Sequence, residues 1–133
     1  MFKTNLLAGL AALLVAACSS VPPDENVVRA DRKISGITFS GCQPSADSSP
    51  KLVTGKAPIY PVHRWLEREE GYAIIAFDIT ASGKAENFEM IASSNPVFYT
   101  HTRVAVTDWI FEPATQDGEP LTVRCQFRQS FSL

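Results

Sequence analysis

The sequence predicts an α+β fold in which helices cover one face of an antiparallel sheet. Residues 121–133 alternate apolar and polar side chains almost without interruption, and residues 72–80 do the same over a shorter span. Between these two segments, residues 93–109 carry apolar side chains at helical spacing. Strands with one apolar and one polar face are typical of an antiparallel sheet that has one face buried and the other in water.

Residues 72–92 are expected to form a β-hairpin. The first strand, 72–80, places four alternate apolar residues on the expected core face: Ala73, Ile75, Phe77 and Ile79. Its carboxylate, Asp78, is expected to point away from that face into solvent. A tight turn follows at 81–84, where Gly83 supplies the conformational freedom that such turns need, and 85–92 is the return strand.

Two helices are expected. Pro61 suits the first turn of a short helix over 62–70, which Gly71 ends. A second helix begins after the capping residues of Ser93-Ser94-Asn95-Pro96, runs to about Trp109 and is stopped by Pro113. Its apolar face is formed by Phe98, Thr102, Ala105 and Trp109, widened by Tyr99, Val106 and Ile110.

The last strand spans 121–133, after a turn at 116–120. Its core face holds Leu121, Val123, Cys125, Phe127, Phe131 and Leu133. Its polar face holds Thr122, Arg124, Gln126, Arg128 and Ser130.

The first residues have the pattern of a secretory leader: a positive charge at Lys3, then an apolar run over 6–17 that ends in small residues. This run is too short to span a bilayer, which takes about 20 residues. Val15-Ala16-Ala17-Cys18 resembles the lipobox of bacterial lipoproteins, which implies that 1–17 is removed and that Cys18 carries lipid. The alternative is an ordinary cleaved leader followed by an incidental cysteine. Ser19-Ser20 after Cys18 resembles the pattern of outer-membrane sorting.

The rest of the N-terminal half divides into two parts. Residues 18–33 are polar and proline-containing, and we expect a flexible tether there. Residues 34–56 are expected to hold a short accessory strand at 34–40 and a loop at 41–50, before the organised domain at 57–133. The net charge of −2, without basic blocks, gives no electrostatic case for nucleic acid.

Two cysteines remain besides Cys18. Cys42 and Cys125 form an even pair, and in an oxidising compartment a disulfide is the default interpretation. A metal site is the alternative, with His63 and His101 as the only histidines that could join them. Structural zinc usually shows closely spaced ligand pairs, which these residues lack, so no metal and no cofactor are expected.

Five short motifs between residues 60 and 113 resemble the TonB C-terminal domain family: Tyr60-Pro61, Glu70-Gly71, residues 77–80, Ser82-Gly83-Lys84 and residues 109–113. The match covers about 57–133. The resemblance implies a three-stranded antiparallel sheet of order 2-1-3 with two helices on one face. The motif residues are expected to be mostly structural: Tyr60, Pro61, Gly71, Gly83, Trp109, Phe111, Glu112 and Pro113.

The resemblance also implies a binding mode. In this family an extended segment of an outer-membrane receptor adds to the free edge of the sheet, as edges allow. The expected contact strand is Val123, Arg124, Cys125, Gln126, Phe127, Arg128, Gln129, Ser130 and Phe131. Together with the lipobox-like leader and Ser19-Ser20, the resemblance predicts a lipid-anchored envelope protein that faces the periplasm, with the outer membrane favoured over the inner. Its partner would be a protein or peptide in transport across the outer membrane, not nucleic acid or a small molecule.

No catalytic residue is expected, because no nucleophile elbow, phosphate-binding loop, dinucleotide fingerprint or His-Glu metal motif is present. The cluster Glu67, Glu69 and Glu70 is expected to be a solvated face. Two other functions stay open. One is a true energy transducer, which a tether of about 15 residues, at most roughly 50 Å long, disfavours. The other is a structural lipoprotein whose own segment 34–40 caps the edge strand.

Overall fold

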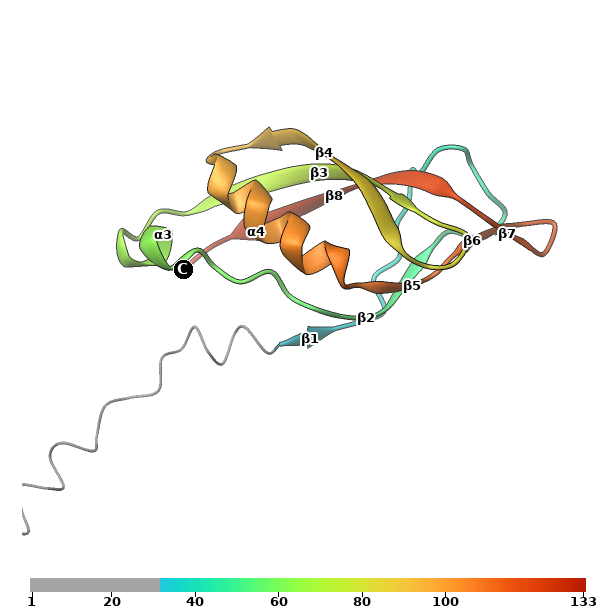
Figure 1. Cartoon of the computed structure of the whole chain (residues 1–133), viewed down its shortest axis with the longest axis horizontal. Coiled ribbons are helices and arrows are strands. Elements are labelled where there is room, and N and C mark those ends of the chain that lie inside the picture. The colour runs from blue at the N-terminus through green and yellow to red at the C-terminus, as the bar shows by residue number, and fades with distance from the viewer. Residues whose placement is uncertain (1–31) are drawn as a thin grey trace, which may run out of the picture.

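The central feature of the computed structural model, which describes residues 32–133, is a three-stranded antiparallel sheet (Figure 1). Its strands are β3 (Gly71–Ile79), β4 (Ala85–Ser93) and β8 (Val123–Phe131), in the order β4-β3-β8. This confirms the predicted order 2-1-3. The leader, Cys18 and most of the predicted tether lie outside the described residues.

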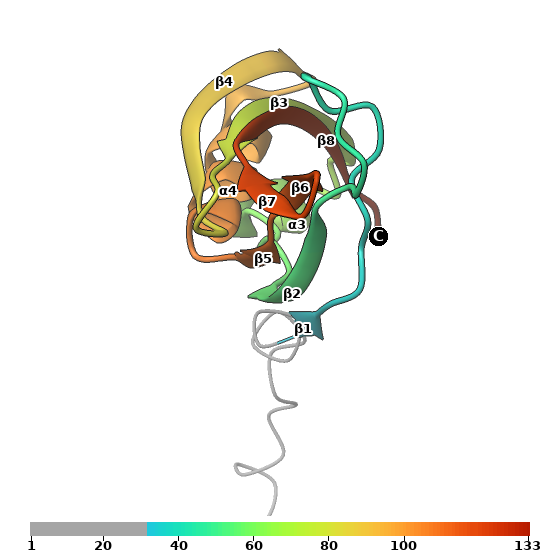
Figure 2. The ribbon, with the colours of Figure 1, turned by 90° about the vertical axis from the view of Figure 1, so that its right-hand side faces the viewer.

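A second layer lies under one face of this arched sheet (Figure 2). It contains the helices α3 (Val62–Leu66) and α4 (Pro96–Thr107) and a small sheet of β1 (Lys33–Ile34), β2 (Lys51–Lys56) and β5 (Ile110–Glu112). The hairpin of β6 (Ala114–Gln116) and β7 (Glu119–Leu121) connects β5 to β8 along the chain. The α+β class is therefore confirmed. Within residues 32–133, neither helix is long and apolar enough to cross a membrane.

The core lies between the two layers. All four predicted core residues of β3 are fully buried: Ala73, Ile75, Phe77 and Ile79. Trp109 and Phe111 are buried beside them, as the motif residues were expected to be. Large aromatic side chains contribute most of the apolar area that a small core can bury, and here Phe111 makes tilted ring contacts with Phe77 and Trp109.

The first helix is shorter than expected, because α3 ends at Leu66 instead of reaching residue 70. The left-handed residue after it is Arg68, with φ 57°, and not Gly71. Arg64 Nη1 holds the reversal, at 3.1 Å from Glu67 Oε2 and 3.0 Å from Glu69 Oε2. Gly71 instead begins β3, where a Cβ would lie 2.2 Å from Ser94 Oγ. Two of the three glutamates expected to be merely solvated are thus ion-paired.

The second helix begins as predicted and ends early. Asn95 is its N-cap, and the Asn95 Oδ1 accepts a hydrogen bond from Val97 N at 3.1 Å. The helix ends at Thr107, where bonds from residues 108 and 109 back to 105 and 106 tighten the last turn. Its buried face is Phe98, Thr102 and Val106. Trp109 is buried from the extended chain that follows, and not from the helix as expected.

The expected last strand is two strands. β7 and β8 are separated at Thr122, whose Oγ1 accepts a hydrogen bond from Ala81 N at 3.0 Å. Only the second of them joins the central sheet. Along β8 the alternation holds, with Val123, Cys125 and Phe131 buried. Leu133 lies beyond the strand and is exposed, against the prediction.

The segment before Ala57 belongs to the same core. Phe39 and Leu52 are buried within it, and β2, which the sequence did not predict, pairs with β5. Residues 33–39 run antiparallel to β2 through bonds such as Gly36 N to Leu52 O (2.7 Å). They do not pair with β8. The predicted boundary at residue 57 therefore divides residues that pack together.

Candidate functional site

The outer edge of β8 is paired at one point only among the described residues. There Arg124 exchanges two backbone hydrogen bonds with Gln43: Gln43 N donates to Arg124 O at 2.9 Å, and Arg124 N donates to Gln43 O at 2.7 Å. Because both polar groups of a strand residue point the same way, the backbone of Arg124 faces away from β3. Gln43 was not expected at the site, and no motif in the sequence marks it.

The remaining outward groups follow by alternation. β8 pairs with β3 in an unbroken register from Val123 to Phe131, so every second residue repeats the outward direction of Arg124. These residues are Gln126, Arg128 and Ser130, and all three are exposed. Their backbone N–H groups have no recorded partner within residues 32–133. The carbonyl of Ser130 accepts a hydrogen bond from its neighbour, Gln129 Nε2, at 2.8 Å.

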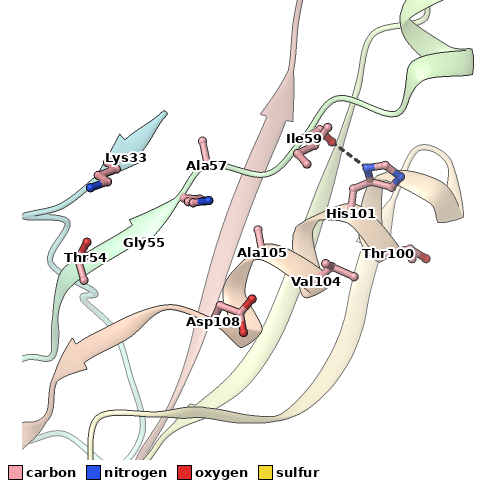
Figure 3. Close-up of a pocket in the computed structure, with 11 residues that line it drawn as sticks. Lys33, Thr54, Gly55, Ala57, Ile59, Thr100, His101, Val104, Ala105 and Asp108 are labelled. Carbon is pink, nitrogen blue, oxygen red and sulfur yellow. Dashed lines mark hydrogen bonds between the residues drawn. The ribbon is translucent and has the colours of Figure 1, made fainter. Parts of the chain in front are cut away.

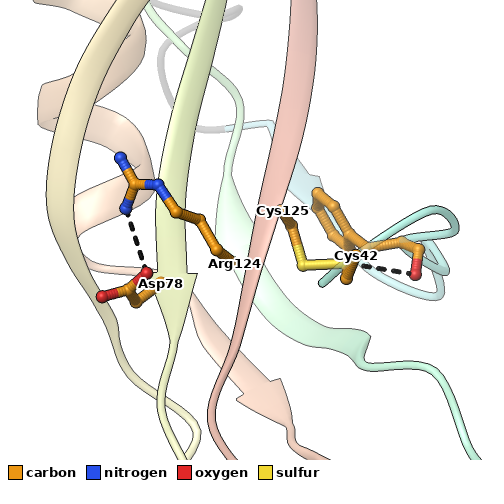
Figure 4. The surroundings of a disulfide bond; sticks show 5 residues. Cys42, Asp78, Arg124 and Cys125 are labelled. Carbon is orange, nitrogen blue, oxygen red and sulfur yellow. Dashed lines mark hydrogen bonds and ion pairs between the residues drawn. A yellow bond between two sulfur atoms is a disulfide. The ribbon is translucent and has the colours of Figure 1, made fainter. Parts of the chain in front are cut away.

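A disulfide fastens the Gln43 segment to the strand. Cys42 is bonded to Cys125, with the two Cα atoms 4.4 Å apart, and this is the pair that the sequence suggested. Figure 4 shows Cys125 on one side of β8 and Arg124 on the other. The sulfurs lie on the buried side, where both cysteines belong to the core. Cys42 is thus covalently bonded, and Gln43 hydrogen-bonded, to the same end of β8.

The open face of the sheet carries an ion-pair network at this end. Arg124 Nη1 lies 3.0 Å from Asp78 Oδ1 and Arg124 Nη2 lies 3.1 Å from Glu89 Oε2. Asn87 Nδ2 donates to Asp78 Oδ2 at 2.8 Å. The hydrogen bond from Asn87, with the hydrogen bond and charge of Arg124, holds the pKa of Asp78 below its ordinary value of 3.8 against the opposing effect of burial. Asp78 is therefore paired, where the sequence suggested a solvated carboxylate.

Arg128 has different surroundings. Its guanidinium carbon lies 4.3 Å from the ring centroid of Tyr72, a cation–π contact. Within residues 32–133 no carboxylate is recorded as its partner. A hollow of about 530 Å³ lies beside Arg124 and Gln126, and Gln43 also lines it. A second hollow, of about 390 Å³, lies at the far end of the strand beside Ser130 and Phe131.

The structure places the predicted site residues in two groups. Of the nine predicted contact residues, those on the core side are Val123, Cys125, Phe127, Gln129 and Phe131. Those on the open face are Arg124, Gln126, Arg128 and Ser130. Of the motif residues, Tyr60 and Pro61 are buried at the start of α3, and Glu112 is exposed in β5 opposite Lys51. Pro113 links β5 to β6.

A separate groove of about 530 Å³ lies between β2 and α4 (Figure 3). Its walls are mainly apolar, with Ile59 on one side and Val104 and Ala105 on the other. His101 Nδ1 donates a hydrogen bond to Ile59 O at 2.9 Å, which ties the loop before α3 to the helix. The groove shares no residue with the β8 edge.

Comparison with known proteins agrees with the fold. The family model described as Gram-negative bacterial TonB protein C-terminal matches residues 56–133, more than half of the chain. The chain therefore belongs to this family. The solution NMR structure of the Pseudomonas aeruginosa TonB CTD superposes with a TM-score of 0.58 at 23% identity, over 71% of this chain and 96% of that one.

Curated relatives match somewhat more than half of the chain. Protein TonB of Klebsiella aerogenes is 32% identical over 82 residues, which are 61% of this chain and 33% of that protein. Protein TonB of Salmonella typhimurium is 28% identical over 85 residues, which are 63% of this chain and 35% of that protein. The chain thus spans about a third of the length of the curated relatives it matches.

Proposed function

We propose that this protein is a lipid-anchored module of the bacterial envelope that binds an extended segment of a partner protein along the edge of β8. The observation that carries the proposal is the row of outward backbone groups at Gln126, Arg128 and Ser130, which have N–H donors without partners in the described part of the chain. Such an edge is a template for one more strand. Backbone hydrogen bonds then supply affinity, and alternate side chains supply specificity.

The family supports a place for this binding in transport across the outer membrane. The partner we propose is a short segment of an outer-membrane receptor, presented on the periplasmic side. The proposed role is binding, and it uses no catalytic residue, cofactor or metal.

The proposed anchor is a lipid on Cys18, at the end of the lipobox-like sequence. Ser19-Ser20 supports the outer membrane as its location. Residues 19–31 would then connect the anchor to Arg32 and the folded part. This segment is long enough to hold the edge of β8 a few tens of ångströms from the membrane surface.

The alternative of a self-capped edge has narrow support. Residues 33–39 pair with β2 and leave β8 open. Within residues 32–133, the backbone of Arg124 is the one outward position of β8 that is hydrogen-bonded, by Gln43. Three of the four outward positions of β8 stay exposed among the residues described.

A pair of proline substitutions tests the proposal. Gln126→Pro removes an outward N–H, and Gln129→Pro removes an N–H that points at β3. A photo-crosslinking residue at Ser130 reports partner binding in intact cells, and the same residue at Arg103 on α4 is the position control. We expect Gln126→Pro to abolish the Ser130 crosslink while the melting temperature changes little. Gln129→Pro should instead lower the melting temperature, because it breaks the ladder to β3.

Two results would contradict the proposal. One is a Ser130 crosslink that survives Gln126→Pro at unchanged yield. The other is a crosslink pattern that is the same from Arg103 as from Ser130, since α4 lies on the opposite side of the central sheet from its open face.

A further inference from the structure

We propose that the edge of β8 accepts an extended segment of a partner in a single register. Gln43 blocks this edge at one end, and Arg128 selects an acidic residue at the facing position of the partner segment. This inference rests on the proposed function, because it specifies the partner of that same edge. It depends on three features of residues 32–133: the Cys42–Cys125 disulfide, the pairing of Gln43 with Arg124, and the charge of Arg128, which has no carboxylate partner there.

Gln43 acts as a stop. A strand added to β8 must lie 4.7–4.9 Å from it, along the line that the backbone of Gln43 already occupies beside Arg124. Two backbone hydrogen bonds and a buried disulfide hold Gln43 there. A partner cannot take the Arg124 position without breaking both bonds, so its pairing must begin at Gln126.

The open part of the edge is short. From Gln126 to Ser130 it offers three outward N–H groups over five residues, about 16 Å of strand at the usual rise. At the far end, the hollow beside Ser130 and Phe131, with Pro58 on its other side, leaves space for the partner chain to continue. A partner segment therefore needs about five extended residues, without a proline where β8 requires a donor.

The charges along the edge favour an acidic residue at one place. The guanidinium of Arg124 is neutralised by Asp78 and Glu89. Arg128 lies opposite Ile74 of β3, which in turn lies opposite Ala92 of β4, and neither of these residues carries a charge. Arg128 stacks on Tyr72, which fixes its direction and leaves its positive charge without a carboxylate among the described residues. An aspartate or glutamate beside Arg128 would form an ion pair that the fold itself does not provide.

The same charge argues against a second copy of this chain as the occupant. Self-pairing of two β8 edges about the middle of the open part would bring the two Arg128 side chains next to each other. Like charges directly opposite each other destabilise a strand pair. The occupant we infer is therefore an acidic extended segment of another protein.

A peptide scan tests the register and the charge together. The probe is a labelled nine-residue peptide of alternating threonine and valine, with one aspartate moved stepwise along it, and binding is measured by fluorescence anisotropy. We expect one aspartate position to bind roughly 2- to 5-fold tighter than the neutral peptide, the effect of one exposed ion pair. Arg128→Gln should remove this preference, and Arg103→Gln, an exposed arginine of α4, should keep it. Raising the salt concentration should also remove it.

Amide hydrogen exchange with the same peptide tests the stop. In the free oxidised protein, Arg124 N–H should be protected already, whereas Gln126, Arg128 and Ser130 should exchange fast. Saturating peptide should protect those three and leave Gln43 protected. In the double variant Cys42→Ser/Cys125→Ser, the protection of the Arg124 N–H should fall. Tight binding should then extend to peptides that pair further toward the Arg124 end of β8.

Each contrary result points to one part of the argument. Equal binding of all aspartate positions, with the three amides protected, overturns the acidic preference and leaves the proposed function standing. Loss of Gln43 protection when peptide binds the oxidised protein overturns the stop. Protection of the three amides without peptide, together with a dimer in sedimentation, identifies a second copy as the occupant and overturns the inference. Protection of none of them, with or without peptide, contradicts the proposed function itself.

Discussion

The indole of Trp109 lies directly against the backbone of Gly55. A Cβ added at Gly55 would stand 2.3 Å from Trp109 Cδ1, and Trp109 Nε1 donates a hydrogen bond to Lys56 O at 2.8 Å. Trp109 lies within the residues that the family model matches, whereas Gly55 lies just before them. The two residues thus join the N-terminal segment to the core of the domain.

Gly55→Ala is expected to destabilise the protein by about 1–3 kcal/mol, the usual effect of overpacking a well-filled site. The indole cannot move aside without losing its hydrogen bond to Lys56 O. Urea unfolding measures the change, and Thr54→Ala, an exposed neighbour in β2, is the control. A change below about 0.5 kcal/mol for Gly55→Ala would show that the contact is looser than described.

The Cys42–Cys125 disulfide is expected to stabilise the fold by up to about 4 kcal/mol, because it closes a loop between residues 83 apart in the sequence. The double variant Cys42→Ser/Cys125→Ser should unfold at lower urea concentration than the oxidised parent. With a reductant present, the two proteins should unfold alike. Non-reducing peptide mapping that finds two free thiols in protein isolated from the periplasm would contradict this prediction.

Asp78→Asn should change the way in which the free energy of unfolding depends on pH in the acid range. The pKa of Asp78 is lowered in the folded state, so its contribution is present above the unfolded value near 3.8 and is lost as the pH falls through the folded value. The free energy of unfolding of the parent should therefore exceed that of the variant by a nearly constant amount from about pH 5 upward, on the order of 0.5 kcal/mol for an ion pair this exposed. The difference should shrink below about pH 4.

Unfolding curves at several pH values measure this difference. Glu119→Gln, an exposed acid in β7, is the matched control and should give no such pH-dependent difference. A difference between parent and Asp78→Asn that stays constant down to pH 2 would mean that the charge of Asp78 is not what stabilises the fold.

Cys18→Ser should release the protein from membranes. If Cys18 carries lipid, the parent fractionates with membranes and its N-terminal peptide is heavier by two or three acyl chains, enough for stable anchoring. The variant should lack this mass and should leave the membrane fraction. A variant that is processed normally and remains with membranes would contradict the lipoprotein hypothesis.

Much of the central sheet could be predicted from the sequence because alternation is a local signal. Ala73, Ile75, Phe77 and Ile79 face the core as their spacing indicated, and the turn at Gly83 and the cap at Asn95 are where their residue types favour them. Boundaries were less predictable. α3 ends four residues before the predicted end, with Arg68 in the left-handed region, and Arg64 pairs with Glu67 and Glu69 around this turn.

By itself, the sequence determined the strands of the central sheet, the start of α4 and the faces that they bury, since these depend on neighbours along the chain. Only the tertiary structure decided how the N-terminal segment is used. Residues 33–39 pair with β2, Cys42 is disulfide-bonded to Cys125 of β8, and among the described residues outside the central sheet only Gln43 exchanges backbone hydrogen bonds with β8. It also decided that, within the described part of the chain, Arg124 is ion-paired and Arg128 is not, because their neighbours Asp78, Glu89, Ile74 and Ala92 come from other strands. Pairing between strands depends on contacts across long stretches of sequence, and no local pattern specifies which residues will meet.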